Sequence, residues 1–244
     1  MTQKPTSSRT KILIASGILA TVALIYIILP KGESNKQGEN SASSFQSTAP
    51  KSFHGFTRDG IGGDPLLNDQ KNRWTAPTAL LQLSVSQIMA LPHSELSSMG
   101  KEDRKKWTAT AIAQADASES HGVQVVGYLA KAKESGSEAC NGKSDALHDF
   151  HIWITESPGE NKNQGIIIEA TPYWKEQFPA WTLQAFEKLA LNNAKVRILG
   201  WLLWDDEHAD EVGKSRGSLW EVHPFTKFEV EIGGSWKELG SNSL

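Results

Sequence analysis

The first 70 residues divide sharply into an apolar run and a polar run. Residues 12–29, ILIASGILATVALIYIIL, carry no charge over 18 positions and are followed by Pro30 and Lys31. A helix over this run rises roughly 27 Å, close to the apolar thickness of a bilayer. The pattern therefore predicts a tail over 1–11 and a transmembrane helix over 12–30 that acts as an uncleaved signal-anchor.

Two alternatives to an anchor are a cleaved signal peptide and a buried core helix. The apolar region of a signal peptide usually spans about 7–15 residues and ends in a small-x-small cleavage site, which residues 26–30 do not offer. A core helix would need neighbouring segments to pack around it. Lys4, Arg9 and Lys11 precede the run, which favours a cytoplasmic N-terminus. The expectation is a single-pass protein of the cell membrane, attached through residues 12–29, with its soluble domain extracytoplasmic.

Residues 31–63 follow as a polar stretch rich in Ser, Asn, Gln, Gly and Lys. Such a composition buries too little apolar area to offset its ordering entropy, so it predicts a flexible tether. The domain is expected to start near Asp64 with a helical extension over 64–121. Helix formers within that extension predict a short helix over 78–91 and a second helix over 101–117.

From residue 122 onward the chain alternates apolar and polar positions and is rich in β-branched and aromatic residues. This pattern predicts five strands, with one helix over 175–191 between the third and the fourth; the strands cover 123–133, 149–155, 165–171, 195–204 and 218–232. Three strands, a helix and two strands is the order of an OB-fold barrel. Gly127 and Gly200 lie inside strands, where glycine permits the coiling that closes a small barrel.

The predicted fold class is therefore mainly β with flanking helices, an OB-like five-stranded barrel over 122–232 followed by a tail over 233–244. An unrelated α+β sheet is the alternative. Proline cannot donate to a β-ladder, so a bend or bulge is expected at Pro224.

Alternation within the second strand separates two faces. Phe150, Ile152 and Ile154 are wholly apolar and point inward, so the outer face carries the other three residues of the strand, Asp149, His151 and Trp153. Two polar groups beside an exposed Trp predict a ligand platform. The alternative is that Asp149 and His151 only bond neighbouring strands or loops.

The last strand contains the pentapeptide WEVHP, in which Glu221 and His223 share one partly covered face. A buried Glu–His pair needs hydrogen bonds between its own two side chains. Its role is then either to hold the bend at Pro224 or to contribute to ligand binding. A second set of side chains could hold a divalent metal as cofactor: His151, Asp205, His208 and His223. The alternative is that the acidic segment 205–211 is simply a solvated loop.

Ion pairs are also expected on these strands. Arg216 lies across a loop from the acids of 205–207, and Glu169 is expected to pair with Arg197 on the next strand.

Composition and charge limit the classes of partner and site that the sequence predicts. The formal net charge is -3, and five acids lie within the seven residues 205–211, so nucleic acid is an unlikely partner. The single cysteine, Cys140, excludes an intramolecular disulfide and a Cys-based metal cage. The chain contains no GxSxG, HExxH, P-loop or GxGxxG pattern. Whether the domain is an enzyme is therefore left open.

Seven segments resemble a family of bacterial proteins with no established activity, marked by the motifs GWLxxDxxH and RGxLWExHPxTxxEV. They are GDPLLNDQKNR at 63–73, VVGYLA at 125–130, EACN at 138–141, DFHIWI at 149–154, EATP at 169–172, GWLLWDDEH at 200–208 and RGSLWEVHPFTKFEV at 216–230. The resemblance implies a domain over about 64–232 and no function. The strand order is also similar to the staphylococcal-nuclease type of OB barrel, but that nuclease's Arg- and Asp-bearing segments are not visible here.

The function expected from the sequence is a membrane-tethered, OB-like binding module for a protein or glycan ligand on the extracytoplasmic side. The alternative is a metal-dependent hydrolase that uses the His/Asp/Glu set.

Overall fold

The computed structural model describes residues 49–241 of the chain. The expected anchor and most of the expected tether lie outside the described residues. Within residues 49–241, no helix is both long enough and apolar enough to cross a bilayer.

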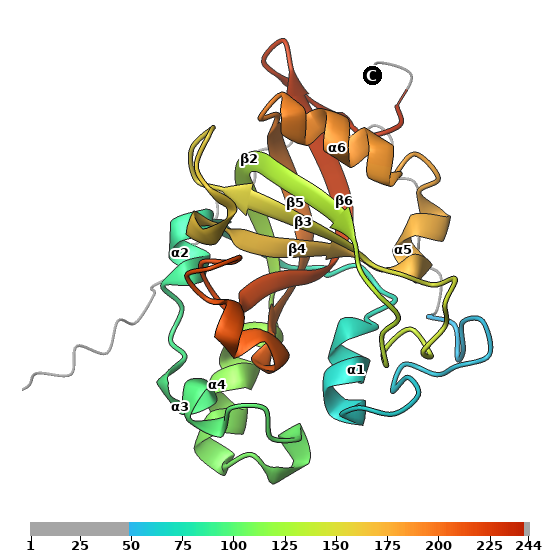
Figure 1. Ribbon diagram of the computed structural model, residues 1–244, viewed down its shortest axis with the longest axis vertical. Helices are drawn as coiled ribbons and strands as arrows, with labels where there is room; N and C mark the ends of the chain where they lie inside the picture. The colour runs from blue at the N-terminus through green and yellow to red at the C-terminus, as the bar shows by residue number, and fades with distance from the viewer. Residues whose placement is uncertain (1–48, 242–244) are drawn as a thin grey trace, which may run out of the picture. The chain divides into compact units, whose positions relative to one another are not determined.

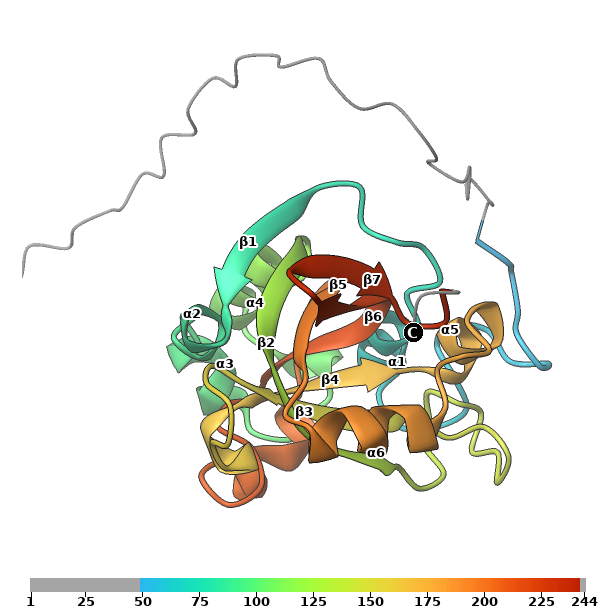
Figure 2. The same ribbon diagram turned by 90° about the horizontal axis from the view of Figure 1, so that it is seen from above.

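Five strands close into a barrel, as the alternating pattern predicts. The order around the barrel is β2, β3, β4, β6 and β5, and β5 pairs back to β2. Two further strands extend the sheet: β1 runs parallel to β2, and β7 is antiparallel to β6. The strand bounds are Leu80–Ser84 for β1, Gly122–Glu134 for β2, Phe150–Thr155 for β3, Ile166–Ala170 for β4, Lys195–Trp204 for β5, Trp220–Ile232 for β6 and Ser235–Glu238 for β7. Figure 2 shows the curved strands β2, β5 and β6 around the barrel.

Helices flank the barrel at both of its ends. Figure 1 shows α6 near the upper end, α5 at the right side, and α1, α3 and α4 near the lower end. Their bounds are Pro65–Lys71 for α1, Val85–Met89 for α2, Ser94–Met99 for α3, Ala109–Glu119 for α4, Pro172–Gln177 for α5 and Leu183–Leu191 for α6, with 3-10 turns at Arg104–Lys106, Lys162–Gln164 and Asp206–Glu211.

Glycine is required where β5 crosses β6. A Cβ atom on Gly200 would lie 2.5 Å from the carbonyl oxygen of Pro224 and 2.6 Å from the Cα of Phe225. Both neighbours are backbone atoms, so neither could move aside. The register between β5 and β6 shifts on both sides of Gly200, which confirms the irregularity expected near Pro224.

Aromatic side chains fill the barrel interior beneath α6. Phe186 on α6 lies 5.0 Å from Phe228 and 6.2 Å from Phe225, measured between ring centroids. All three side chains are fully buried. This apolar interior holds the strands in place, so their opposite faces can carry polar groups.

Candidate buried carboxylate and histidine site

Strand pairing brings three polar side chains together on the outer face of the barrel. His151 on β3 lies directly opposite Glu169 on β4. β4 runs parallel to β6 with Ile168 opposite Val222, so the next residues along, Glu169 and His223, are also neighbours. Glu169 is the shared member, because β4 lies between the other two strands.

The two oxygens of Glu169 face the two imidazoles. Oε1 lies 3.2 Å from Nε2 of His151, and Oε2 lies 3.2 Å from Nδ1 of His223. The expected pair of Glu169 with Arg197 is wrong, because Arg197 binds Glu229 at 2.5 Å instead. These two residues lie opposite each other on β5 and β6, so Arg197 has a nearer acid than β4 can offer.

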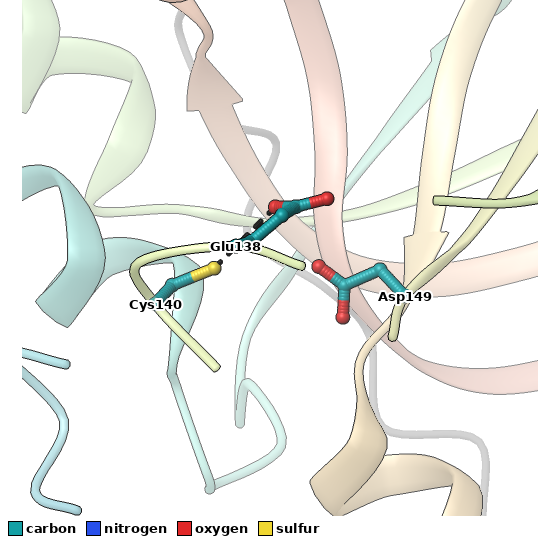
Figure 3. Close-up of side chains that lie close together, drawn as sticks. All are labelled: Glu138, Cys140 and Asp149. Carbon is teal, nitrogen blue, oxygen red and sulfur yellow. Dashed lines mark hydrogen bonds between the residues drawn. The ribbon is translucent and has the colours of Figure 1, made fainter. Parts of the chain in front are cut away.

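A loop between β2 and β3 adds three more groups. Cys140 Sγ donates to Glu138 Oε2 over 3.5 Å, and Asp149 lies close to both (Figure 3). Glu138 Oε1 also lies 3.5 Å from Nε2 of His151. The loop therefore extends the His151–Glu169 pair into a larger polar cluster.

Three overlapping triads in this cluster have potential metal-ligand atoms within 4.8 Å of one another. They are Glu138, His151 and Glu169; Asp149, Glu169 and His223; and Glu138, Cys140 and Asp149. We call their six members, Glu138, Cys140, Asp149, His151, Glu169 and His223, the carboxylate–histidine cluster. The second triad is completely buried, whereas Glu138 of the other two is partly exposed.

Loops cover most of this outer face of the barrel. Trp153 is only 2% exposed, and its Nε1 donates to the carbonyl oxygen of Ser215 over 2.6 Å. The prediction of an exposed Trp153 is therefore wrong: alternation places it outside the barrel, but the 205–219 loop folds over it. The Asn72 amide, just after α1, binds the carbonyl of Cys140 and holds the other covering loop.

A second network borders the cluster. Arg216 Nη1 lies 2.6 Å from Asp205 and 3.3 Å from Glu221, which confirms its expected pairing with the acidic loop. His208 is 2.6 Å from the same Asp205 oxygen, and Nδ1 of His223 is 3.1 Å from Glu221. Asp205 and His208 thus belong with Arg216 and do not join His151 and His223 in any of the three triads.

The cluster lacks balancing positive charge. Within residues 49–241, no Lys or Arg nitrogen lies within 4.0 Å of a carboxylate oxygen of Glu138, Asp149 or Glu169. The charge of the buried Lys71 acts on all three carboxylates, but its direct ion pair, at 2.8 Å, is with Glu207. Buried carboxylates without a cation are costly unless they are protonated or coordinate a metal.

Several polar atoms also lack well-aligned hydrogen bonds in the described part of the chain. They are both carboxylate oxygens of Asp149, Oε2 of Glu169, Nε2 of His151 and Nε2 of His223. The His151 and Glu169 atoms lie at ion-pair distance from a partner without forming a hydrogen bond, and the side-chain amide of Asn141 interacts with Asp149. Buried groups of this kind are normally satisfied, so these atoms indicate a missing partner.

Burial shifts the pKa values of two acids and of one imidazole in this cluster in opposite directions. Burial raises the pKa of Asp149, and the Glu138 charge adds to the rise. Burial also raises the pKa of Glu169, with Glu221, Glu138 and Asp149 adding to it. Burial lowers the pKa of His223 despite its hydrogen bond to Glu221. Asp149, Glu169 and His223 thus favour their neutral forms, and neutral imidazole is the form that coordinates metals. Glu138 differs, because the effect of its burial is outweighed by its contact with His151 and the charge of Lys71, which lower its pKa.

A polar pocket of about 420 Å³ opens beside the cluster. Glu138, Cys140 and His151 reach its wall, and so do Lys71, Lys133 and His208. The remaining lining residues come from α1, from the loop between β2 and β3 and, with Glu207, from the turn at Asp206–Glu211. The cluster is therefore connected to solvent on its Glu138–His151 side.

The structure brings together four of the five predicted ligand-binding residues: Asp149, His151, Glu221 and His223. Their role in binding stays a prediction. Sequence reasoning missed Glu138 and Lys71 as neighbours and gave Glu169 another partner. The EACN and EATP segments contain Glu138 and Glu169, and the polar residues in those segments were the available signal.

Comparisons with known proteins give one structural similarity. No protein-family model and no curated protein matches the chain. One solved structure, that of yeast Stn1 and Ten1, is similar with a TM-score of 0.35 and 15% identity, over 76% of this chain and 78% of that one. The strand order by itself makes the described part of the chain a mainly-β, OB-like closed five-stranded barrel with flanking helices.

Two sequence-based predictions are corrected. The first is the membrane-tethered, extracytoplasmic module for a protein or glycan, with a metal-dependent hydrolase as its alternative. The second is that nucleic acid is an unlikely partner. The finding that stands against both is the similarity to the solved structure of Stn1 and Ten1, whereas residues 12–29 lie outside the described residues. Neither prediction is carried further.

Proposed function

We propose that this OB-like domain binds a divalent transition metal ion of the zinc or manganese kind at the carboxylate–histidine cluster. The observation that supports it most is the convergence of buried, poorly partnered atoms from Asp149, Glu169 and His223 on one small region. A divalent cation there would supply the positive charge that the described chain does not.

The donor types favour this class of metal. Imidazole and carboxylate together suit zinc and manganese, whereas Mg²⁺ and Ca²⁺ prefer all-oxygen sites. Cys140 adds a sulfur close to Glu138, but burial and the nearby Asp149 and Glu138 charges raise its pKa well above the usual range. Its thiol is therefore protonated in the metal-free chain, and the carboxylates and imidazoles are the primary ligands.

The proposal is tested by the metal content of the purified full-length chain and by titration of the metal-free chain with Zn²⁺ and Mn²⁺. We expect at least one ion per chain with a micromolar or tighter Kd, and much weaker binding of Mg²⁺. Asp149→Asn removes a ligand charge with little change of shape and should weaken binding by at least tenfold. His223→Gln should do the same.

Asp145→Asn is the matched control, because Asp145 lies exposed in the same loop and belongs to no triad. It should bind metal like the unmodified chain. If the unmodified chain binds neither Zn²⁺ nor Mn²⁺ while remaining folded by circular dichroism, protons neutralise the cluster and the proposal fails.

A further inference from the structure

The polar pocket beside the cluster has charged side chains in its wall that a metal ion in the cluster would leave free for a further ligand. Its wall combines the outer triad residues Glu138 and His151 with two lysines, Lys71 and Lys133. An ion held by the outer triad would have Glu138, His151 and Glu169 as ligands. Because two of these three line the pocket, a free coordination position would point into it.

Lysine side chains gather around the Trp153 ring, and one of them, Lys133, lines this pocket. Three of them, Lys131, Lys133 and Lys162, lie with their Nζ atoms 5.8, 5.6 and 5.2 Å from the centre of the Trp153 ring. Within residues 49–241, no carboxylate oxygen lies within 4.0 Å of any of these three nitrogens, in contrast to Lys71, which binds Glu207. Lys133 joins this lysine group to the pocket wall.

The lysine charge and a bound metal ion would both attract an anion into the pocket. Without an ion, the carboxylates of the cluster would repel an anion from the pocket. With a divalent ion in the outer triad, the pocket would have the metal at its base and Lys133 at its side. Metal plus lysine is the combination that recognises phosphate oxygens, with lysine as a point charge.

We infer that the metal-loaded pocket binds a small molecule through a phosphate group. A phosphate oxygen would take the free metal position, and Lys133 would pair with a second oxygen. The cavity volume of about 420 Å³ lies within the range typical of sites for small ligands and suits a molecule of about nucleotide size. This inference rests on the proposed metal site, with an ion at its outer triad, which shares Glu169 with the buried triad of Asp149, Glu169 and His223.

The probe is inorganic phosphate, added to the full-length chain loaded with Mn²⁺ and followed by ³¹P relaxation and by calorimetry. Manganese is paramagnetic, so a phosphate in its coordination sphere relaxes much faster than free phosphate. We expect this enhancement with the loaded chain and none with the metal-free chain. A nucleoside monophosphate in place of phosphate should bind at least as tightly if the rest of the pocket contributes.

Lys133→Ala should raise the Kd for phosphate about tenfold, the loss expected for one charge-assisted contact, while leaving the Kd for Mn²⁺ unchanged. Lys133 is exposed on β2, so its removal leaves no cavity in the core. Lys188→Ala, which removes an exposed lysine on α6 away from the pocket, is the matched control and should change neither constant.

Four results would overturn the inference. Mn²⁺ binding without any phosphate enhancement contradicts it and leaves the proposed metal site intact. Equal phosphate binding by Lys133→Ala, or by the metal-free chain, contradicts the assigned contacts. Binding of a labelled single-stranded oligonucleotide without binding of phosphate or a nucleoside monophosphate assigns the lysines to a polymer instead. Failure to bind Mn²⁺ at all removes both this inference and the proposed function.

Discussion

At the scale of single residues, Asp206 is the acid whose titration is easiest to isolate. Burial raises its pKa to about 7, with Asp205 and Glu207 adding to the rise and Arg104 opposing it. Its folded-state pKa therefore lies above its unfolded value, and the folded chain holds the proton more tightly. The resulting contribution to stability is complete below about pH 4 and is lost as the pH rises through about 7.

Asp206→Asn removes this loss. We expect the variant and the unmodified chain to have similar free energies of unfolding near pH 4, and the variant to be more stable by roughly 1–3 kcal/mol at pH 8. Urea unfolding at both pH values measures the difference. Parallel pH profiles for the two proteins would show that Asp206 titrates normally in the folded chain.

Single residues also show which parts of the candidate site can be predicted from the sequence. Alternation alone places His151 outside the barrel and pairs Glu221 with His223, because a strand has a side-chain period of two. The partner of Glu169 is not local information: it depends on β4 lying between β3 and β6. Trp153 shows the same limit, since only a loop some 60 residues away in sequence, at Ser215, decides whether it is exposed.

At the scale of elements, one buried ion pair attaches α4 to the barrel. Arg104 makes two bonds to Glu119, of 2.6 and 2.9 Å, and a third of 2.7 Å to the carbonyl of Trp204 on β5. Glu119 also accepts from the backbone N–H of Trp204 over 2.8 Å. Both side chains are buried, so neither can replace a lost partner with water.

Glu119→Gln keeps the shape of this contact but leaves the Arg104 charge unpaired. Breaking a buried pair from one side costs about 3–5 kcal/mol, and we expect a loss of that size in urea unfolding. Asp116→Asn, an exposed acid on the same helix, should change stability by less than about 0.5 kcal/mol. A loss below 1 kcal/mol for Glu119→Gln would mean that water reaches Arg104.

The helices predicted from the sequence agree less well with the structure than the predicted strands do, for physical reasons. The helix expected over 175–191 is two helices, α5 and α6, because Pro179 interrupts the pattern between them. The segment expected as a helix over 78–91 contains β1 before α2. β1 exists through its parallel pairing with β2, some 40 residues away in sequence, and local periodicity cannot report such a partner.

At the scale of the whole molecule, barrel closure creates the carboxylate–histidine cluster. Its members span residues 138 to 223 and come from a loop and three strands. The strand order could be read from the sequence, because three strands, a helix and two strands allow few closed arrangements. The meeting of the polar faces could not, because the covering loops that bury them have no periodic pattern.

Because its ligands are so far apart in sequence, the proposed metal site exists only in the folded chain. Binding to the folded state alone stabilises it by RT ln(1 + [L]/Kd), about 2.7 kcal/mol at 100 times the Kd. For a folded region of this size, that corresponds to an increase in Tm of roughly 5–10 °C. Thermal unfolding of the full-length chain should therefore shift upward with Zn²⁺ or Mn²⁺ and return to its starting value with excess EDTA.

The same scan separates site binding from general ion effects. Asp149→Asn should abolish the shift, whereas Asp145→Asn should keep it. The metal-free Asp149→Asn variant should also unfold at a higher temperature than the metal-free unmodified chain, because it replaces a buried acid with a neutral amide. An equal metal-induced shift in both variants would place the ion elsewhere on the protein. A lower Tm for metal-free Asp149→Asn would mean that the carboxyl already has a partner within the chain.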